Sequence, residues 1–216
     1  MLTLPVVLLT GFEPFGGDSV NPSALAVRAL HGRSILGHPI VSALLPVTFD
    51  AACLAMDALL TTHRPALVIT VGQAGGRAAV SLERLAINVD DARIADNAGA
   101  QPIDQPVVAG GPAAYFSTLP IKAMRAEILA AGMPADVSQT AGTFVCNHVF
   151  YGLMHRLATD EELKATRGGC IHVPWLPEQG TPALALEDTI RALDLAIQTA
   201  LSHSGDDLSV TAGATH

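Results

Sequence analysis

The stretch that decides the fold runs from residue 5 to residue 32 and reads "PVVLLTGFEPFGGDSVNPSALAVRALHG". It begins with a short apolar run, typical of a buried strand, and continues through a loop rich in Gly, Pro and Asp. A helix is expected from Asn21, because Asn is a favourable N-cap, Pro22 suits the first helical position and Gly32 ends the helix. The stretch therefore predicts one strand–loop–helix unit.

The same alternation continues along the chain. "IVSALLPV" (residues 40–47) precedes the helical pattern "DAACLAMDALLTTH" (50–63), and the strand-like "ALVITVG" (66–72) precedes a loop. Further strands are expected at 85–89, 135–139 and 169–175, and further helices at 119–132, after Cys146 and at 185–203. This order predicts an α/β fold, with a twisted, mostly parallel (mixed) sheet covered by helices on both faces. Residues 95–114 carry the Gly, Pro, Asp and Asn of a long excursion.

Size and composition limit the possible functions. A chain of 216 residues is expected to form a single domain, here residues 1–203, followed by a frayed tail at 204–216 that has no periodicity. The net charge of -8, from 12 basic and 20 acidic residues, argues against nucleic acid as a partner. No apolar run is long enough to cross a bilayer, and the N-terminal run has no basic flank of a signal peptide. With three cysteines and no C-x-x-C pair, a soluble cytoplasmic protein is expected.

Three loops are candidates for the functional site, because α/β proteins bind ligands where strands end. They are Gly11 to Asn21, Gly72 to Glu83 and Thr140 to Asn147. None has the lysine of a P-loop or the spacing of a dinucleotide fingerprint, so nucleotide binding is poorly supported.

Cys146 is the candidate nucleophile. In "SQTAGTFVCNHVFYGLMHRL" it lies where a strand-like segment passes into a helical one, and the helix dipole there favours a thiolate. The alternative is a small buried hydrophobic residue between Val145 and Val149. For Cys53, in mid-helix, and Cys170, in a strand, burial in the core is the better interpretation.

A cysteine nucleophile needs a histidine base, and that base needs an orienting acid. His172 is favoured because its strand runs into Pro174 and a loop, whereas His148 should point away from Cys146. His148 and His155 share a helix face, but no carboxylate joins them at ligand spacing, so no metal site is expected. The other histidines are interpreted as surface residues: His31, His38, His63, His203 and His216. Among the acids, spacing does not rank Glu83 above Asp90, Asp91 and Asp96.

Several long blocks resemble the type I pyroglutamyl peptidases (pyrrolidone-carboxylate peptidases). They are "LLTGFEPFGGDSVNPS", "VGQAGGRAAVSLERLAINVDDARIADNAGAQP", "AAYFSTLPIKAM", "SQTAGTFVCNHVFYGLMH" and "IHVPWLPEQ", and they cover the chain from about Leu8 to Gln179. The resemblance implies a cysteine peptidase that removes N-terminal 5-oxoproline from peptides and needs no cofactor. It also implies a three-layer α/β/α, phosphorylase/hydrolase-like fold and a homo-oligomer, a dimer or tetramer.

The resemblance also implies roles for single residues. It places the nucleophile at Cys146, the base at His172 and the acid at Glu83. Arg93 would lie near the oxyanion, together with the backbone N–H of Cys146. The implied substrate pocket comprises Phe12, Phe15, Asn21, Gln73, Phe144 and Val145.

Two other functions fit the residues less well. A nucleoside phosphorylase-like enzyme would need an anion site, for which Arg77 and the glycine loop are the only support. A non-catalytic small-molecule binding protein would have the same pocket, but its function would not depend on the Cys146 thiol.

Overall fold

The computed structural model describes residues 4–213. Its main sheet has seven strands in the order β2-β3-β1-β4-β9-β5-β8, and a separate two-stranded sheet pairs β6 with β7. The strands are β1 (Val7–Phe12), β2 (Ser34–Ile35), β3 (His38–Leu45), β4 (Leu67–Gln73), β5 (Val80–Glu83), β6 (Leu85–Ile87), β7 (Ala114–Phe116), β8 (Ala135–Ser138) and β9 (Arg167–Val173). The helices are α1 (Pro22–Leu30), α2 (Phe49–His63), α3 (Ile121–Ala130), α4 (Val145–Thr159) and α5 (Leu186–Ser202), with a short 3-10 turn η1 (Glu161–Leu163).

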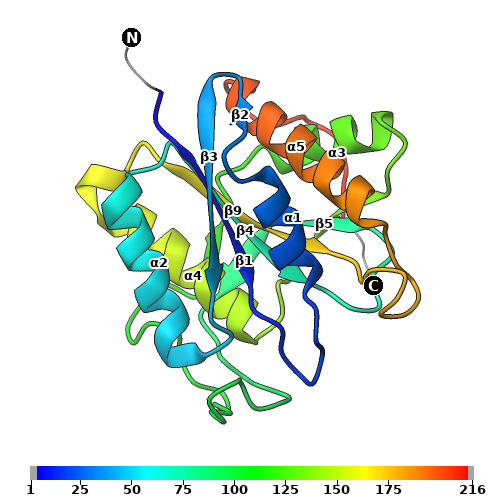
Figure 1. Cartoon of the computed structure of the whole chain (residues 1–216). Coiled ribbons are helices and arrows are strands. Elements are labelled where there is room, and N and C mark those ends of the chain that lie inside the picture. Colours follow the sequence, from blue (N-terminus) through cyan, green and yellow to red (C-terminus); the bar gives the residue numbers. More distant parts are fainter. Residues whose placement is uncertain (1–3, 214–216) are drawn as a thin grey trace.

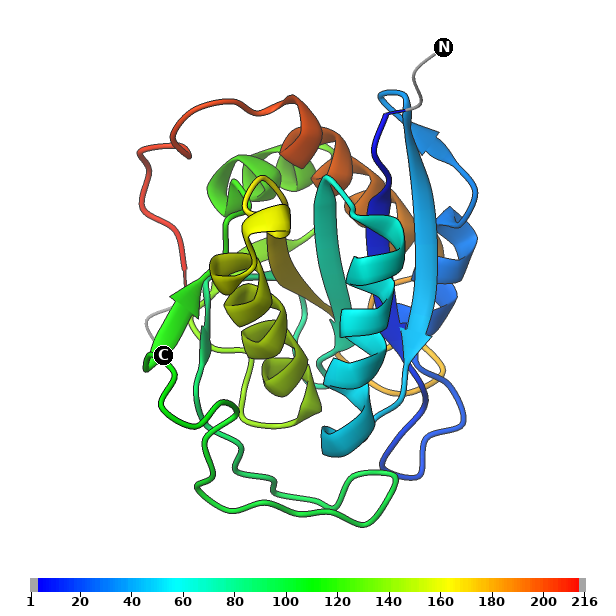
Figure 2. The same ribbon diagram turned by 90° about the vertical axis from the view of Figure 1, so that its left-hand side faces the viewer.

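Helices cover both faces of the sheet, as predicted (Figure 1). Helices α1, α3 and α5 pack together on one face, and α2 packs against α4 on the other, where Figure 2 shows this pair in front of the sheet. Successive residues of β1 serve the two layers in turn, because side chains alternate across a strand: Val7 and Leu9 face the first group of helices, and Leu8 faces the second. The α/β/α sandwich follows from this alternation.

The sheet is mixed because three of its strands, β2, β5 and β8, run in the opposite direction to the other four. β3, β1, β4 and β9 run parallel to one another, whereas β5 pairs antiparallel with β9 and parallel with β8. The half-exposed strand expected at 85–89 is the shorter β6, and the buried strand β5, which ends at Glu83, precedes it without having been expected. β5 therefore runs in the opposite direction to β4 and β9, and Glu83, its last residue, contacts His172 of β9.

The first strand–loop–helix unit forms as predicted. Asn21 caps α1, since its Oδ1 accepts a hydrogen bond from Ser23 N at 3.0 Å, and Pro22 occupies the first turn. The long excursion also lacks regular structure from residue 91 to 113, and it lies beside the loop that follows β1 at the lower edge of Figures 1 and 2.

The C-terminal tail differs from the expectation of fraying over residues 204–213. Asp207 accepts hydrogen bonds from Lys122 N at 2.8 Å and Ala123 N at 3.0 Å, and so caps α3. The carbonyl of Ala212 accepts from Arg84 Nη2 at 3.0 Å. The lack of periodicity does not predict these contacts of the tail, because helix capping and loop hydrogen bonds need no repeating pattern. Residues 214–216, with His216, lie outside the described part.

Candidate functional site

The candidate site is a cavity of about 390 Å³ at the end of β4 and β9. All three predicted loops contribute to it: Phe15 comes from the first, Gln73 from the second and Phe144 from the third. Cys146 and His172 both line the cavity. The topology thus brings together segments that are far apart in the sequence.

Cys146 lies in the first turn of α4, as its sequence pattern predicted. The helix begins at Val145, and Phe144 occupies the N-cap position in an extended conformation. Phe144 and Cys146 both line the cavity, so the positive end of the helix dipole lies at its wall, and no acidic side chain in the first turn offsets this charge. This end of a helix suits a negative charge, on either a thiolate or an oxyanion.

His172 lies between the thiol and a buried acid. Its Nδ1 donates a hydrogen bond to Glu83 Oε1 over 2.7 Å, a contact between residues 89 positions apart. Its other ring nitrogen, Nε2, approaches Cys146 across Gly72. A Cβ atom on Gly72 would lie 2.9 Å from both Cys146 Sγ and His172 Nε2, so the thiol and the imidazole share the space that the glycine leaves open.

Burial and charge shift the acid and the imidazole in opposite directions. Burial lowers the pKa of His172, but its hydrogen bonds and electrostatic attraction to Cys146 and Glu83 raise that pKa to about 9. Burial raises the pKa of Glu83, and its hydrogen bond and attraction to His172, the nearby Ser138 hydroxyl and the charge of Arg77 together hold it below the ordinary value. At neutral pH the carboxyl is therefore ionised and the imidazole protonated.

The other three candidate acids, Asp90, Asp91 and Asp96, lie elsewhere or bind other groups. Asp90 Oδ2 accepts from His148 Nδ1 at 2.8 Å. Asp96 accepts from Phe49 N at 2.9 Å, at the start of α2. Asp91 is exposed at the cavity wall. Of the four acids, Glu83 is the one that contacts His172.

The aromatic wall is only partly the predicted one. Phe15 and Phe144 face each other with ring centroids 5.9 Å apart, and Phe49 packs edge-on against Phe144 at 5.5 Å. Phe12 and Val145 are buried in the core between the sheet and α4 instead of lining the cavity. Phe12 falls within the loop predicted from Gly11 to Asn21, but in the structure it ends β1, where strand alternation turns it inward.

Of the two polar residues of the predicted pocket, Gln73 lines the cavity and Asn21 does not. Gln73 lines the cavity, and its amide is held at both ends: Nε2 donates to Asp18 Oδ2 and Oε1 accepts from Gln179 Nε2, each over 3.1 Å. Asn21 is buried away from the cavity, where its Nδ2 donates to the carbonyl of Glu13 at 3.1 Å. Asn21 therefore shapes the loop that carries Phe15.

Two arginines lie at the cavity. Arg93 lines the wall. The sequence suggests Arg77 only as part of an anion site, but its Nη1 lies 2.7 Å from Glu83 Oε1 and its Nη2 donates to the carbonyl of Thr140 at 3.1 Å. The sequence signal for the contact between Arg77 and Glu83 is weak: a single cation in the glycine loop, six residues before Glu83.

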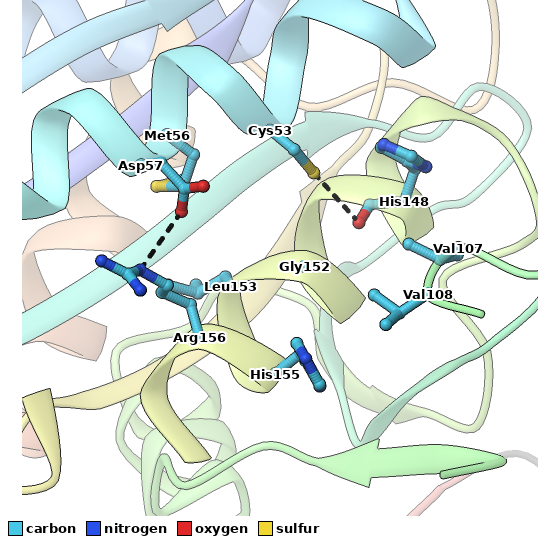
Figure 3. A pocket seen from close by; sticks show the side chains of 10 residues that line it. All are labelled: Cys53, Met56, Asp57, Val107, Val108, His148, Gly152, Leu153, His155 and Arg156. Atoms are coloured by element: carbon cyan, nitrogen blue, oxygen red, sulfur yellow. Dashed lines mark hydrogen bonds and ion pairs between the residues drawn. The ribbon is translucent and has the colours of Figure 1, made fainter. Parts of the chain in front are cut away.

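A second, smaller cavity of about 180 Å³ lies between α2 and α4 (Figure 3). His148 and His155 both border it, and this confirms that they share a helix face turned away from Cys146. Cys53 is half-buried at this cavity, not in the core as expected, and its thiol donates to the carbonyl of His148 over 3.7 Å. Cys170 is buried, as expected. Over residues 4–213 no three His, Cys, Asp or Glu side chains are grouped as metal ligands, and no helix there is long and apolar enough to cross a membrane.

Comparisons with known proteins give one family. The family model described as pyroglutamyl peptidase matches residues 6–203. The pyrrolidone-carboxylate peptidase of Cupriavidus taiwanensis is 63% identical over 208 residues, which cover 94% of this chain and 96% of the relative. That of Erwinia tasmaniensis is 56% identical over 215 residues, covering 97% and 99%.

Solved structures agree with this. The pyroglutamyl peptidase I of Bacillus amyloliquefaciens superposes with a TM-score of 0.93 at 46% identity, covering 96% of this chain and 100% of the other. The pyrrolidone carboxyl peptidase of Thermococcus litoralis gives 0.93 at 34% identity, with the same coverage. The chain belongs to the pyroglutamyl peptidase family and is a cysteine omega-peptidase.

Proposed function

We propose that this enzyme hydrolyses the peptide bond after an N-terminal pyroglutamyl (5-oxoproline) residue, with Cys146 as nucleophile, His172 as general acid and base, and Glu83 as orienting acid. The observation that supports it best is the continuous contact series from thiol to imidazole to carboxylate, with Gly72 leaving room for the first two groups. The family of the chain supports the substrate.

The reaction has two stages. The Cys146 thiolate attacks the pyroglutamyl carbonyl, and the imidazolium of His172 protonates the departing amine, so that a thioester forms and the peptide bond breaks. His172 then removes a proton from water, which attacks the thioester and restores the thiol. In both stages the oxyanion is stabilised by the N–H of Cys146 at the start of α4, and Arg93 adds positive charge nearby.

The pocket suits a flat, uncharged lactam. Phe15 and Phe144 pack against each other and give the cavity an aromatic wall for one face of the lactam, and Gln73 presents an amide of fixed orientation to the lactam N–H and C=O. A proline ring would leave those polar groups unpaired, and this mismatch discriminates against it.

The test is hydrolysis of a pyroglutamyl anilide by the wild type and by Cys146→Ser and His172→Ala, with a prolyl anilide as the substrate control. Both variants should be inactive but folded, and the prolyl compound should not turn over. Activity in either variant would contradict the proposed roles. A phosphorylase-like function is disfavoured because the guanidinium of Arg77, its main support, is already paired with Glu83.

We also propose a cytoplasmic homo-oligomer, since the family resemblance implies both. Sedimentation of the purified protein tests the assembly, and a monomer at micromolar concentration would contradict it.

A further inference from the structure

We propose that Arg77 is a positioning residue for the peptidase reaction, and that it keeps Glu83 ionised and fixed while His172 is neutral in the thioester stage. This inference rests on the proposed roles of Cys146, His172 and Glu83.

The geometry places two cationic donors on one oxygen. Arg77 Nη1 and His172 Nδ1 each lie 2.7 Å from Glu83 Oε1. The Glu83 side chain is fully buried, and its Oε2 has no hydrogen-bond partner among residues 4–213. A buried carboxylate with one unpartnered oxygen depends on the charges around it to stay ionised.

The charge balance changes during the reaction. Before the amine leaves, two cations contact Glu83: the imidazolium of His172 and the guanidinium of Arg77. After His172 gives its proton to the leaving amine, Arg77 is the cation that still contacts Glu83. Without it, the buried carboxylate would be favoured to take up a proton, and it would then hold Nδ1–H of His172 less firmly. Nε2 would in turn be less available as a base toward water.

Arg77 also connects the acid to the segment that carries the nucleophile. Its Nη2 donates to the carbonyl of Thr140 at 3.1 Å, and its Nη1 lies 3.4 Å from Ser138 Oγ. Residues 139–144 lead from β8 into α4, so the guanidinium joins the end of β5 to the approach to Cys146. Arg77 contacts Glu83 and the segment before Cys146 at the same time, from two nitrogens of one planar group. Lysine has one terminal nitrogen and lacks this planar arrangement of donors.

The experiment compares Arg77→Met, Arg77→Lys and a matched control, Arg84→Met. Arg84 follows Glu83 directly, but its side chain bonds Gln139 and the carbonyl of Ala212, away from the acid. Turnover of a pyroglutamyl anilide is measured from pH 5 to 11, with circular dichroism to establish folding. Intact mass spectrometry after acid quenching measures the thioester.

Arg77→Met should lower kcat by about tenfold to a hundredfold, the size expected for one charge-assisted hydrogen bond to a buried carboxylate. Its pH profile should move to higher pH, because the carboxyl and the imidazolium both lose a neighbouring cation and so hold their protons to higher pH. The pyroglutamyl thioester should accumulate. Arg77→Lys should keep the wild-type pH profile with a smaller loss of kcat, and Arg84→Met should match the wild type.

A folded Arg77→Met enzyme with wild-type kcat and pH profile would overturn the proposal, as would an equal loss in Arg84→Met. If Arg77→Met does not fold, the kcat and thioester level of Arg77→Lys decide: wild-type values of both would overturn the proposal. Failure of the reaction mechanism itself is recognised separately, by activity in Cys146→Ser or His172→Ala.

Discussion

Gly72→Ala tests most directly whether the thiol and the imidazole act together. The added Cβ would lie 2.8 Å from His172 Cδ2 and 2.9 Å from both His172 Nε2 and Cys146 Sγ. Ordinary contacts between such atoms are about 3.5–4.0 Å, so the ring or the sulfur must retreat by roughly 0.6–1.2 Å. A misplacement of about 1 Å in a catalytic pair costs on the order of 100-fold in rate, which is the loss expected here.

The substitution should leave the fold intact. Gly72 lies in β4 and does not have a positive φ, so alanine is compatible with its backbone. Gly168→Ala is the matched control: it lies in the neighbouring strand β9, and its Cβ would meet Leu157 Cδ1 at 2.7 Å, the far end of a flexible side chain outside the site.

The assay is turnover of a pyroglutamyl anilide, together with the alkylation rate of Cys146 by iodoacetamide and the thermal midpoint. Gly72→Ala should lose turnover and react more slowly at Cys146, and its thermal midpoint should fall because the buried His172 ring must shift. Gly168→Ala should keep turnover per folded molecule, with a smaller fall in thermal midpoint because the flexible end of Leu157 can move aside. A folded Gly72→Ala enzyme with wild-type turnover would refute the view that this glycine makes room for a working thiol–imidazole pair.

Three further outcomes are expected. Because the pKa of His172 is raised to about 9, kcat/KM should fall as pH rises through about 9, where the imidazolium loses the proton that the leaving amine needs; a limb near pH 6.5 would contradict this. Burial lowers the pKa of His148, but Asp90 and then Cys53 raise it to about 10, so this pairing stabilises the fold below pH 6.5 and is lost as pH rises through about 10. Asp90→Asn should therefore cost roughly 1–3 kcal/mol in urea unfolding at pH 7 and little above pH 10, and equal midpoints at pH 7 would argue against the pairing. Phe15→Ala should lower kcat/KM on the anilide about tenfold while iodoacetamide still alkylates Cys146 at the wild-type rate, and equal losses in both assays would remove Phe15 from substrate specificity.

Local signals in the sequence determined much of the architecture. The apolar runs and the cap at Asn21 give strands and helices in the right order, and small residues ahead of an apolar helix place Cys146 at a helix start. These features depend on residues close together in the chain. A single sequence therefore contains them in full.

The choice of acid, the partner of Arg77 and the burial of Phe12 were decided by tertiary structure. Four carboxylates lie between residues 83 and 96, and spacing could not separate them, because the contact that selects Glu83 joins it to a histidine 89 residues away. That contact exists because β5 runs antiparallel to β9, and neither strand's sequence reports this direction. Local patterns thus determined which residues form strands, helices and loops, while the direction of β5 decided which charges meet at the imidazole.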